Sequence, residues 1–270
     1  MRAGNEVGMC TAALLVDPFT ASDDDLRAAV QAAAEAGCSA LSVWSHQLEA
    51  LDDPAQLAVP VGVVEGALLW SGPDAGAADT EARTLAAQAA RYGAGLVLAV
   101  VLDAVPPDAA RARAGLARLA EQVGEAGARV CVEFLPWSGL PSLAAAWELV
   151  GPLSADVGIV LDAWHWQRQP GGPCPDLLGR IPGERIAYLQ LCDAAADPGS
   201  DPMDETMNGR LLPGDGMVDF DSLLTGLEAI GAEPFVATEV FNPGIVRERG
   251  GTGAAGAMVA AARRVLAAGR

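Results

Sequence analysis

Eight short apolar segments, separated by amphipathic stretches, recur along the chain of 270 residues. The stretch SDDDLRAAVQAAAEAG opens with a serine suited to an N-cap and an acidic first turn, and it closes at a glycine, which is the pattern of a helix. TEARTLAAQAARYG is built in the same way. The segments that are expected to form strands are residues 11–16, 40–44, 61–69, 95–102, 129–135, 157–164, 185–192 and 234–241.

These strand candidates are continuous apolar runs, which is typical of parallel sheets that are covered on both faces. Eight strand-helix units of about 34 residues each fit an α/β fold with a single (β/α)8 TIM barrel over residues 1–270. The alternative is an open doubly wound sheet, but the G-x-G-x-x-G sequence is missing after the first strand. Residues 1–8 are expected to form a flexible N-terminal tail.

Charge and composition exclude several classes of function. The formal net charge is −18, which disfavours nucleic-acid binding, and all 17 basic side chains are arginine. Without a lysine the chain can neither form a Schiff base nor build the P-loop of nucleotide hydrolases. The apolar runs end well before the roughly 18 residues of a membrane span, and Met1–Asn5 lacks the apolar core of a signal peptide, so a cytoplasmic protein without a membrane partner is expected.

Four polar residues interrupt the strand candidates near their carboxyl ends, where the active sites of TIM barrels lie. They are Glu133, Asp162, Gln190 and Glu239, on four consecutive strand candidates. Carboxylates that converge at one end of a barrel repel one another unless a cation neutralises them, and oxygen ligands suit Mg²⁺, Mn²⁺ or Co²⁺, with Zn²⁺ possible. For each residue taken alone, the alternative is a buried polar group paired with an arginine or with loop backbone.

The motifs around these residues resemble the xylose isomerase-like TIM-barrel family of sugar and sugar-phosphate isomerases and epimerases. The motifs are VEF at Glu133, LDAWH at Asp162 and His165, LQLCD at Gln190 and Asp193, RLLPGDG at Arg210 and TEVF at Glu239. The resemblance implies that one divalent metal ion is held by Glu133, Asp162, Gln190 and Glu239. It also implies that His165 and Arg210 contact substrate oxygens, and that Glu133 and Glu239 move protons on opposite faces of the substrate.

The implied activity is that of a metal-dependent isomerase or epimerase of a sugar or cyclitol. A metal that chelates a carbonyl and its neighbouring hydroxyl stabilises the enediolate, so a carboxylate over the α-carbon is able to act as base. His165 is then a hydrogen-bond donor or proton shuttle, or alternatively a structural residue of its loop.

Gln190 departs from the family pattern, because most sugar epimerases of this family have a histidine there. An amide oxygen favours Mg²⁺ or Mn²⁺ over Zn²⁺. A similar ligand set occurs in the 3-dehydroshikimate dehydratase branch, where the enolate expels water, so a dehydratase is the alternative enzyme. A sugar-binding barrel without turnover is the non-enzymatic alternative.

Further residues are expected to line the pocket. Trp44 and His46, at the second strand candidate, are expected to line the pocket, with an exposed loop position as the alternative for His46. Trp137, Trp164 and Trp166 are expected either to form an apolar wall that excludes water or to cap the barrel core. Glu65 has no motif support and is interpreted as a pocket or structural residue. The segment 194–216 is interpreted as a lid or as a solvated acidic loop, and its acidity favours a neutral sugar, cyclitol or keto acid over a phosphorylated substrate. The alanine-rich helices also permit a homo-oligomer.

Overall fold

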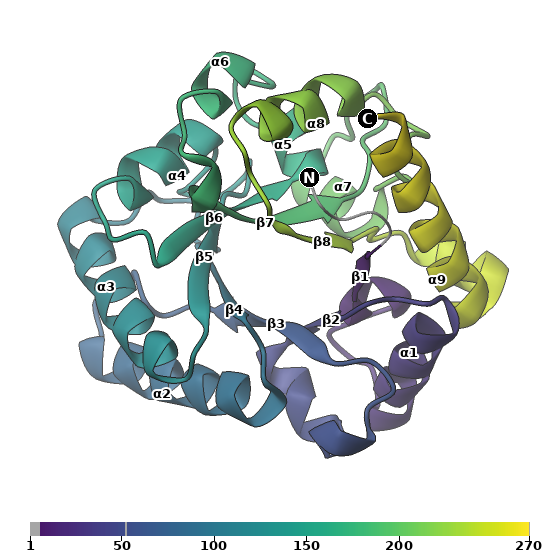
Figure 1. Ribbon diagram of the computed structural model, residues 1–270, viewed down its shortest axis with the longest axis horizontal. Coiled ribbons are helices and arrows are strands. Elements are labelled where there is room, and N and C mark those ends of the chain that lie inside the picture. Colours follow the sequence, from purple (N-terminus) through teal and green to yellow (C-terminus); the bar gives the residue numbers. More distant parts are fainter. Residues whose placement is uncertain (1–5, 52, 270) are drawn as a thin grey trace.

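Eight parallel strands form a closed barrel in the computed structural model, which describes residues 6–51 and 53–269 (Figure 1). Each strand pairs with its sequence neighbours, and β1 pairs with β8 to close the barrel. The strands are β1 (Gly8–Cys10), β2 (Leu41–Trp44), β3 (Val61–Ala67), β4 (Leu96–Val100), β5 (Arg129–Glu133), β6 (Val157–Asp162), β7 (Ile186–Leu191) and β8 (Phe235–Thr238). The predicted (β/α)8 barrel is therefore confirmed.

Helices surround the strands in a ring (Figure 1). The α-helices are α1 (Asp23–Glu35), α2 (Ala75–Tyr92), α3 (Ala109–Glu125), α4 (Leu143–Val150), α5 (Ala163–Arg168), α6 (Pro175–Leu178), α7 (Pro202–Asn208), α8 (Phe220–Ala229) and α9 (Pro243–Ala268). Short 3-10 helices are η1 (Thr11–Leu14), η2 (Ser45–Ala50), η3 (Pro54–Gln56) and η4 (Gly183–Arg185). None of the helices in the described part of the chain is long and apolar enough to cross a membrane.

Helix starts follow the expected capping chemistry. Ser22 accepts a hydrogen bond from the Asp25 amide while the Asp25 carboxylate accepts one from the Ser22 amide, so a complete capping box begins α1. Asp74 caps α2, which therefore begins before the segment that was predicted from residue 80 onward.

The first strand was predicted at the wrong position. Residues 11–14 form η1, and the strand is Gly8–Cys10, which pairs with both β2 and β8. A short apolar run does not by itself distinguish a buried strand from a buried helical turn, and all four residues of η1 are buried. The expected tail is also too long, because Val7 is fully buried and Gly8 begins the strand; residues 1–5 of that tail lie outside the described residues.

Apolar side chains fill the barrel interior. The four polar residues predicted for the site lie at the carboxyl ends of the strands. This inner cluster includes Val63, Leu98, Val160, Tyr188 and Ala237. A larger cluster lies between the strands and the helices. The barrel is therefore a packed core, and any chemistry must occur at one of its ends.

One helix contact requires a glycine and gives a test of the packing. A Cβ atom on Gly115 of α3 would lie 1.8 Å from the carbonyl oxygen of Trp70, a backbone atom that cannot rotate away. We expect Gly115→Ala to lower the free energy of unfolding by about 1–3 kcal/mol. In the matched variant Gly124→Ala, also in α3, nothing lies within 4 Å of the added atom, and we expect a gain of about 0.5–1 kcal/mol. Denaturant unfolding measures both, and equal effects would contradict the close approach of α3 to Trp70.

Candidate active site

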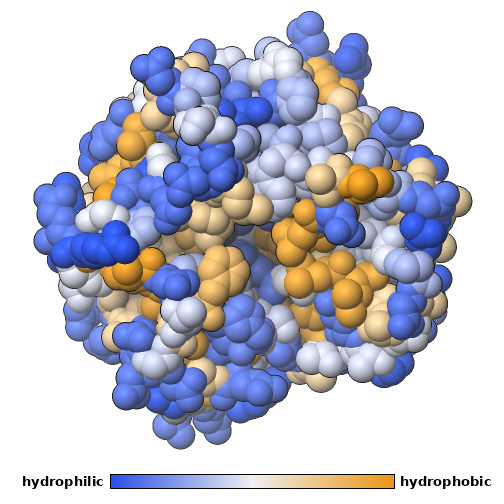
Figure 2. Space-filling model, turned by 180° about the vertical axis from the view of Figure 1, so that it is seen from behind, coloured by the Kyte–Doolittle hydropathy of each residue, from blue (hydrophilic) through white to orange (hydrophobic). Residues whose placement is uncertain are grey.

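The four predicted strand-end residues lie together at the carboxyl end of the barrel. Glu133 and Asp162 are the last residues of β5 and β6, Gln190 is next to last in β7, and Glu239 directly follows β8. Asp162 and Gln190 are register partners on neighbouring strands. The helices that follow β6 and β7 at this end, α5 and α7, are drawn faint on the far side in Figure 1. Figure 2, seen from that side, shows a face that is hollowed near its centre and bordered by apolar side chains.

Arg210 lies at the centre of this group. Its Nη1 donates hydrogen bonds to Asp162 Oδ2 (2.7 Å) and Glu239 Oε2 (3.1 Å), and its Nε donates to the carbonyl oxygen of Thr206 (2.8 Å). The guanidinium is fully buried. Burial lowers its pKa, but the surrounding acidic groups, led by Asp162, outweigh burial and raise the pKa further. The sequence left open whether each carboxylate is paired with an arginine. The structure shows such a pair with Arg210 for both Asp162 and Glu239.

Burial and charge act in opposite directions on the two carboxyl groups that Arg210 bridges. Burial raises the pKa of Glu239, nearby Glu65 raises it further, and Arg210 only partly opposes them, so the pKa is well above its ordinary value. Burial also acts to raise the pKa of Asp162, but Arg210 and His165 outweigh burial and lower it. Glu239 therefore holds a proton more strongly than Asp162, which is the more firmly ionised group.

His165 lies between Glu133 and Arg210. Its Nδ1 is 3.1 Å from Glu133 Oε1, without the geometry of a hydrogen bond, and its Nε2 is 3.3 Å from Arg210 Nη2. The backbone amide of His165 donates to Asp162 Oδ1 (2.8 Å), because Asp162 is the N-cap of α5. The strand-to-helix turn after β6 therefore fixes the imidazole beside a carboxylate at the strand ends.

The donor set fits a divalent cation. Glu133, Asp162 and His165 each offer a ligand atom within 4.8 Å of the others. The fully buried Gln190 donates its Nε2 to Glu239 Oε1 (3.0 Å), whereas its Oε1 meets no hydrogen-bond partner among the described residues. A single buried arginine does not balance the carboxylates gathered here, and an unpaired amide oxygen beside them is a suitable ligand.

The predicted tryptophans and His46 lie in different surroundings. Trp44 packs against the rings of Phe19 (centroids 5.3 Å apart) and Phe241 (6.1 Å), and His46 is exposed on η2 at 5.8 Å from Trp44. Trp164 is fully buried against the Arg210 guanidinium, so contact with a substrate requires some movement around it. Their roles in substrate binding stay predictions.

The segment 194–216 folds over this end of the barrel. At its base, Asp193 and Leu211 exchange two backbone hydrogen bonds of 2.9 Å, and the Asp193 carboxylate accepts from four backbone amides, those of residues 194, 214, 216 and 218. Within the segment, Thr206 of α7 accepts a hydrogen bond from the indole of Trp137 (3.1 Å) and is buried. The two ends of the segment and part of α7 are thus held to the barrel, whereas residues 196–204 are exposed to solvent, and the lid interpretation stays a prediction.

An ion pair that sequence reasoning missed holds α7 down. Arg168 Nε donates to Glu205 Oε1 (2.9 Å), Arg168 Nη2 donates to the carbonyl oxygen of Ala195 (2.6 Å), and Glu205 is buried. The only signal in the sequence was an arginine at the end of the short helix after LDAWH. The partner lies 37 residues away, in a segment without regular periodicity.

Removal of this ion pair is expected to loosen the lid. We expect Arg168→Met to speed hydrogen exchange of the amides in α7 by about 10-fold or more. Local opening of α7 has to break the ion pair in the wild type but not in the variant, so opening needs less free energy in the variant. Arg180→Met, at an exposed position, is the control and should leave α7 unchanged. Mass spectrometry of exchanged peptides measures both, and equal exchange in the two variants would assign the stability of α7 to other contacts.

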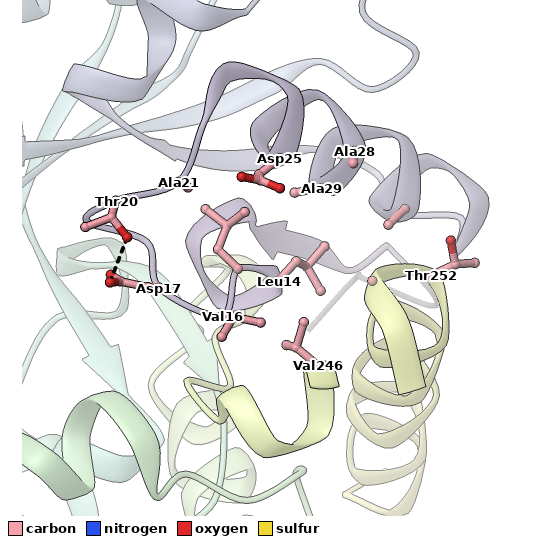
Figure 3. Close-up of a pocket in the computed structure, with 13 residues that line it drawn as sticks. Leu14, Val16, Asp17, Thr20, Ala21, Asp25, Ala28, Ala29, Val246 and Thr252 are labelled. Carbon is pink, nitrogen blue, oxygen red and sulfur yellow. Dashed lines mark hydrogen bonds between the residues drawn. The ribbon is translucent and has the colours of Figure 1, made fainter. Parts of the chain in front are cut away.

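A second hollow lies on the outside of the barrel and carries no comparable chemistry. This groove of about 460 Å³ lies between η1, α1 and α9 (Figure 3). Its two carboxylates have local structural roles, since Asp17 accepts a hydrogen bond from Thr20 (2.8 Å) and Asp25 belongs to the capping box of α1. The strand-end group is therefore the candidate active site.

Comparison with known proteins identifies the family of the chain. Residues 4–267 match the profile of the xylose isomerase-like TIM barrel family. The chain belongs to this family. The family resemblance of the sequence motifs is thereby confirmed, and a location of the site at the strand ends is consistent with TIM-barrel enzymes in general.

Two curated relatives are similar in sequence to part of this chain. A 3-dehydroshikimate dehydratase from Pseudomonas putida is 29% identical over 128 residues, which are 47% of this chain and 20% of that protein. An inosose isomerase from Bacillus subtilis is 30% identical over 120 residues, which are 43% of this chain and 41% of that protein. The chain thus spans less than half the length of the curated relatives that it matches.

Solved structures share the fold over the whole chain. The IOLI protein with a bound zinc atom has a TM-score of 0.81 at 18% identity, covering 98% of this chain and 99% of that one. A xylose isomerase-like TIM barrel/4-hydroxyphenylpyruvate dioxygenase fusion protein has a TM-score of 0.82 at 21% identity, covering 98% of this chain and 43% of that one. These two structures establish the fold.

Proposed function

We propose that the protein is a divalent-metal-dependent isomerase or epimerase of a small keto sugar or cyclitol, and that it transfers a proton next to a carbonyl. The observation that carries the proposal is that Glu133 and Glu239, from opposite ends of the β5–β8 half of the barrel, belong to one buried polar network. His165, Asp162 and Arg210 link the two glutamates, and Gln190 joins the network through Glu239. Two carboxyl groups at one centre suit removal of a proton and its return at another position.

We expect Glu133, Asp162, Gln190 and Glu239 to hold the ion, which when bound polarises a substrate carbonyl as a Lewis acid. Mg²⁺ and Mn²⁺ suit this oxygen-rich set best, although the IOLI structure contains zinc. The amide oxygen of Gln190 supplies a neutral ligand, whereas a histidine there would supply nitrogen.

The protein's own groups have separate tasks in this reaction. Glu239, in its ionised form, accepts the proton from the carbon next to the carbonyl. Glu133 returns a proton, and the imidazole of His165, 3.1 Å from its carboxylate, passes protons to and from it. Arg210 holds Asp162 and Glu239 in place through its two ion pairs, and the lid over residues 194–216 excludes water.

A second candidate function is a dehydratase of the 3-dehydroshikimate type. It shares the proton abstraction, but the deprotonated substrate then loses water. Gln190 favours it, because a similar ligand set with glutamine occurs in that branch of the family, and the Pseudomonas putida relative is an enzyme of this kind. The two functions differ in the mass of the product.

The test uses the full chain, stripped of metal and then supplied with Mn²⁺, Mg²⁺ or no ion. Inosose and 3-dehydroshikimate are incubated with each preparation in deuterated water. An isomerase or epimerase incorporates deuterium next to the carbonyl with no loss of water, and only when the ion is present; a dehydratase yields a product lighter by one water molecule. Absence of both changes under every condition would favour a sugar-binding barrel without turnover.

A further inference from the structure

Glu65 is a buried carboxylate without a cation of its own. Among residues 6–51 and 53–269, Glu133 has His165 within ion-pair distance, and Asp162 and Glu239 share Arg210. No such arginine or histidine lies beside Glu65, whose carboxylate accepts a hydrogen bond from the buried hydroxyl of Ser42. A carboxylate in the middle of an apolar strand is unfavourable for folding unless its surroundings or its function compensate.

The position of Glu65 places it at the candidate active site. Carboxylate oxygens of Glu65 and Glu239 lie within 4.8 Å of each other, beside the thiol of Cys10. The exposed fractions of Glu65, Glu133 and Glu239 are 5%, 8% and 3%, whereas Asp162 and Gln190 are fully buried. Among the carboxylates of this group, the three glutamates therefore keep some exposed surface, whereas Asp162 has none.

The charges around the hollow do not favour an anion. Arg210 is shared between two carboxylates, and Arg168 is paired with Glu205. Of the arginines that the structure describes, these two lie on the segments that follow β6 and β7 over the site, and both are engaged. A carboxylate or phosphate near Glu65 would meet a like charge with no free arginine or histidine of the described chain beside it. Even with a divalent ion bound, the charges of that ion and of Arg210 fall one short of those of the four carboxylates Glu65, Glu133, Asp162 and Glu239.

Aromatic side chains near Glu65 suit the C–H face of a polyhydroxylated ring. Trp44 is the register partner of Glu65 on β2, and its ring packs with those of Phe19 and Phe241. An aromatic wall accepts the C–H face of a cyclitol or sugar ring, and a carboxylate at its edge accepts hydrogen bonds from hydroxyl groups.

From this arrangement we propose that Glu65 is a specificity residue that accepts a substrate hydroxyl and selects an uncharged polyhydroxylated ring over one that bears a carboxylate. The inference rests on the proposed function in that it places the substrate in this hollow. It favours the cyclitol or sugar isomerase over the dehydratase of an anionic keto acid.

The experiment compares two unreactive probes of similar size, neutral myo-inositol and anionic quinate. Calorimetry measures their binding to the Mn²⁺-loaded full chain at about pH 8, above the pKa of about 7 to which burial raises the Glu65 carboxyl. We expect the wild type to bind myo-inositol at least about 10-fold more tightly than quinate, and Glu65→Gln to reduce this ratio by about 10-fold or more. Glu228→Gln, which removes an exposed carboxylate of α8, should change the ratio by less than about 2-fold, because solvent and salt screen its charge.

A second variant keeps the charge. Ser42→Ala removes the hydroxyl that orients Glu65, so we expect weaker binding of myo-inositol while quinate stays excluded. The proposal is overturned if Glu65→Gln has the same ratio as Glu228→Gln, if the wild type prefers quinate, or if neither probe binds.

These outcomes are independent of turnover. If Glu65 controls the ratio but no ketone exchanges deuterium, only the proposed reaction fails. If a carboxylated substrate is turned over equally well by the wild type and by Glu65→Gln, only the specificity role fails.

Discussion

Glu239→Gln is expected to reduce the rate of deuterium incorporation into an accepted ketone by about 10³-fold, because an amide cannot accept the proton. The substitution preserves the size of the side chain and leaves an oxygen that is able to accept from Gln190 or Arg210. Mass spectrometry of the substrate after timed incubation in deuterated water measures the rate. Mn²⁺ affinity, measured in parallel by calorimetry, separates loss of the base from loss of a ligand.

The control for this prediction is Glu248→Gln, an exposed position on α9, which should retain the wild-type rate. Saturation with Mn²⁺ removes any contribution from weaker ion binding. A Glu239→Gln protein that keeps more than about a tenth of the wild-type rate under saturation would assign the base to another group.

Arg210→Met should lower the free energy of unfolding of the metal-free protein by about 3 kcal/mol or more, because it leaves two buried carboxylates without their cation. Asp162 is fully buried and Glu239 nearly so, which leaves little solvent to compensate. Denaturant unfolding at about pH 8 measures the loss. Added Mn²⁺ is expected to restore part of it, since a bound cation stabilises the folded state.

Arg264→Met is the matched control, since Arg264 and Asp215 form an ion pair of 3.9 Å in which both side chains are more than half exposed. Removal of such a pair should change the free energy of unfolding by less than about 0.5 kcal/mol. Arg210→Lys retains the charge but lacks the planar guanidinium, and we expect an intermediate loss. Equal effects at positions 210 and 264 would show that the buried carboxylates find other compensation.

Sequence patterns predicted the parts of the fold whose signal is local. Strands β5 to β8 were located to within a few residues, because each is an apolar run that ends near a polar side chain. β1 was misplaced, because it is only three residues long and the more apolar run after it forms η1. Whether so short a segment forms a strand depends on its pairing with β2 and β8, which lie far away in the sequence. The three residues themselves carry no pattern that predicts this pairing.

Some residues of the candidate site were also predictable from local sequence patterns, whereas others were not. Once a barrel is assumed, strand ends predict that Glu133, Asp162, Gln190 and Glu239 converge. The structure places all four at the same end of the barrel, with Glu133 and Asp162 grouped around His165 and Glu239 beside Glu65. The bridging position of Arg210 was not predictable, because it depends on how the lid segment returns to the barrel. Glu65 lacked a motif because its immediate partner, Ser42, lies on the neighbouring strand.

The pair of backbone hydrogen bonds between Asp193 and Leu211 closes residues 194–210 into a loop whose two ends are tied together beside the candidate site. Arg210 adjoins this closure, and its Nε donates one hydrogen bond to the carbonyl oxygen of Thr206 within the loop. The ion pairs of Arg210 with Asp162 and Glu239 do not depend on that hydrogen bond. A substitution in residues 195–205 is therefore able to change the outer part of the loop while the ionic arrangement beneath it stays assembled.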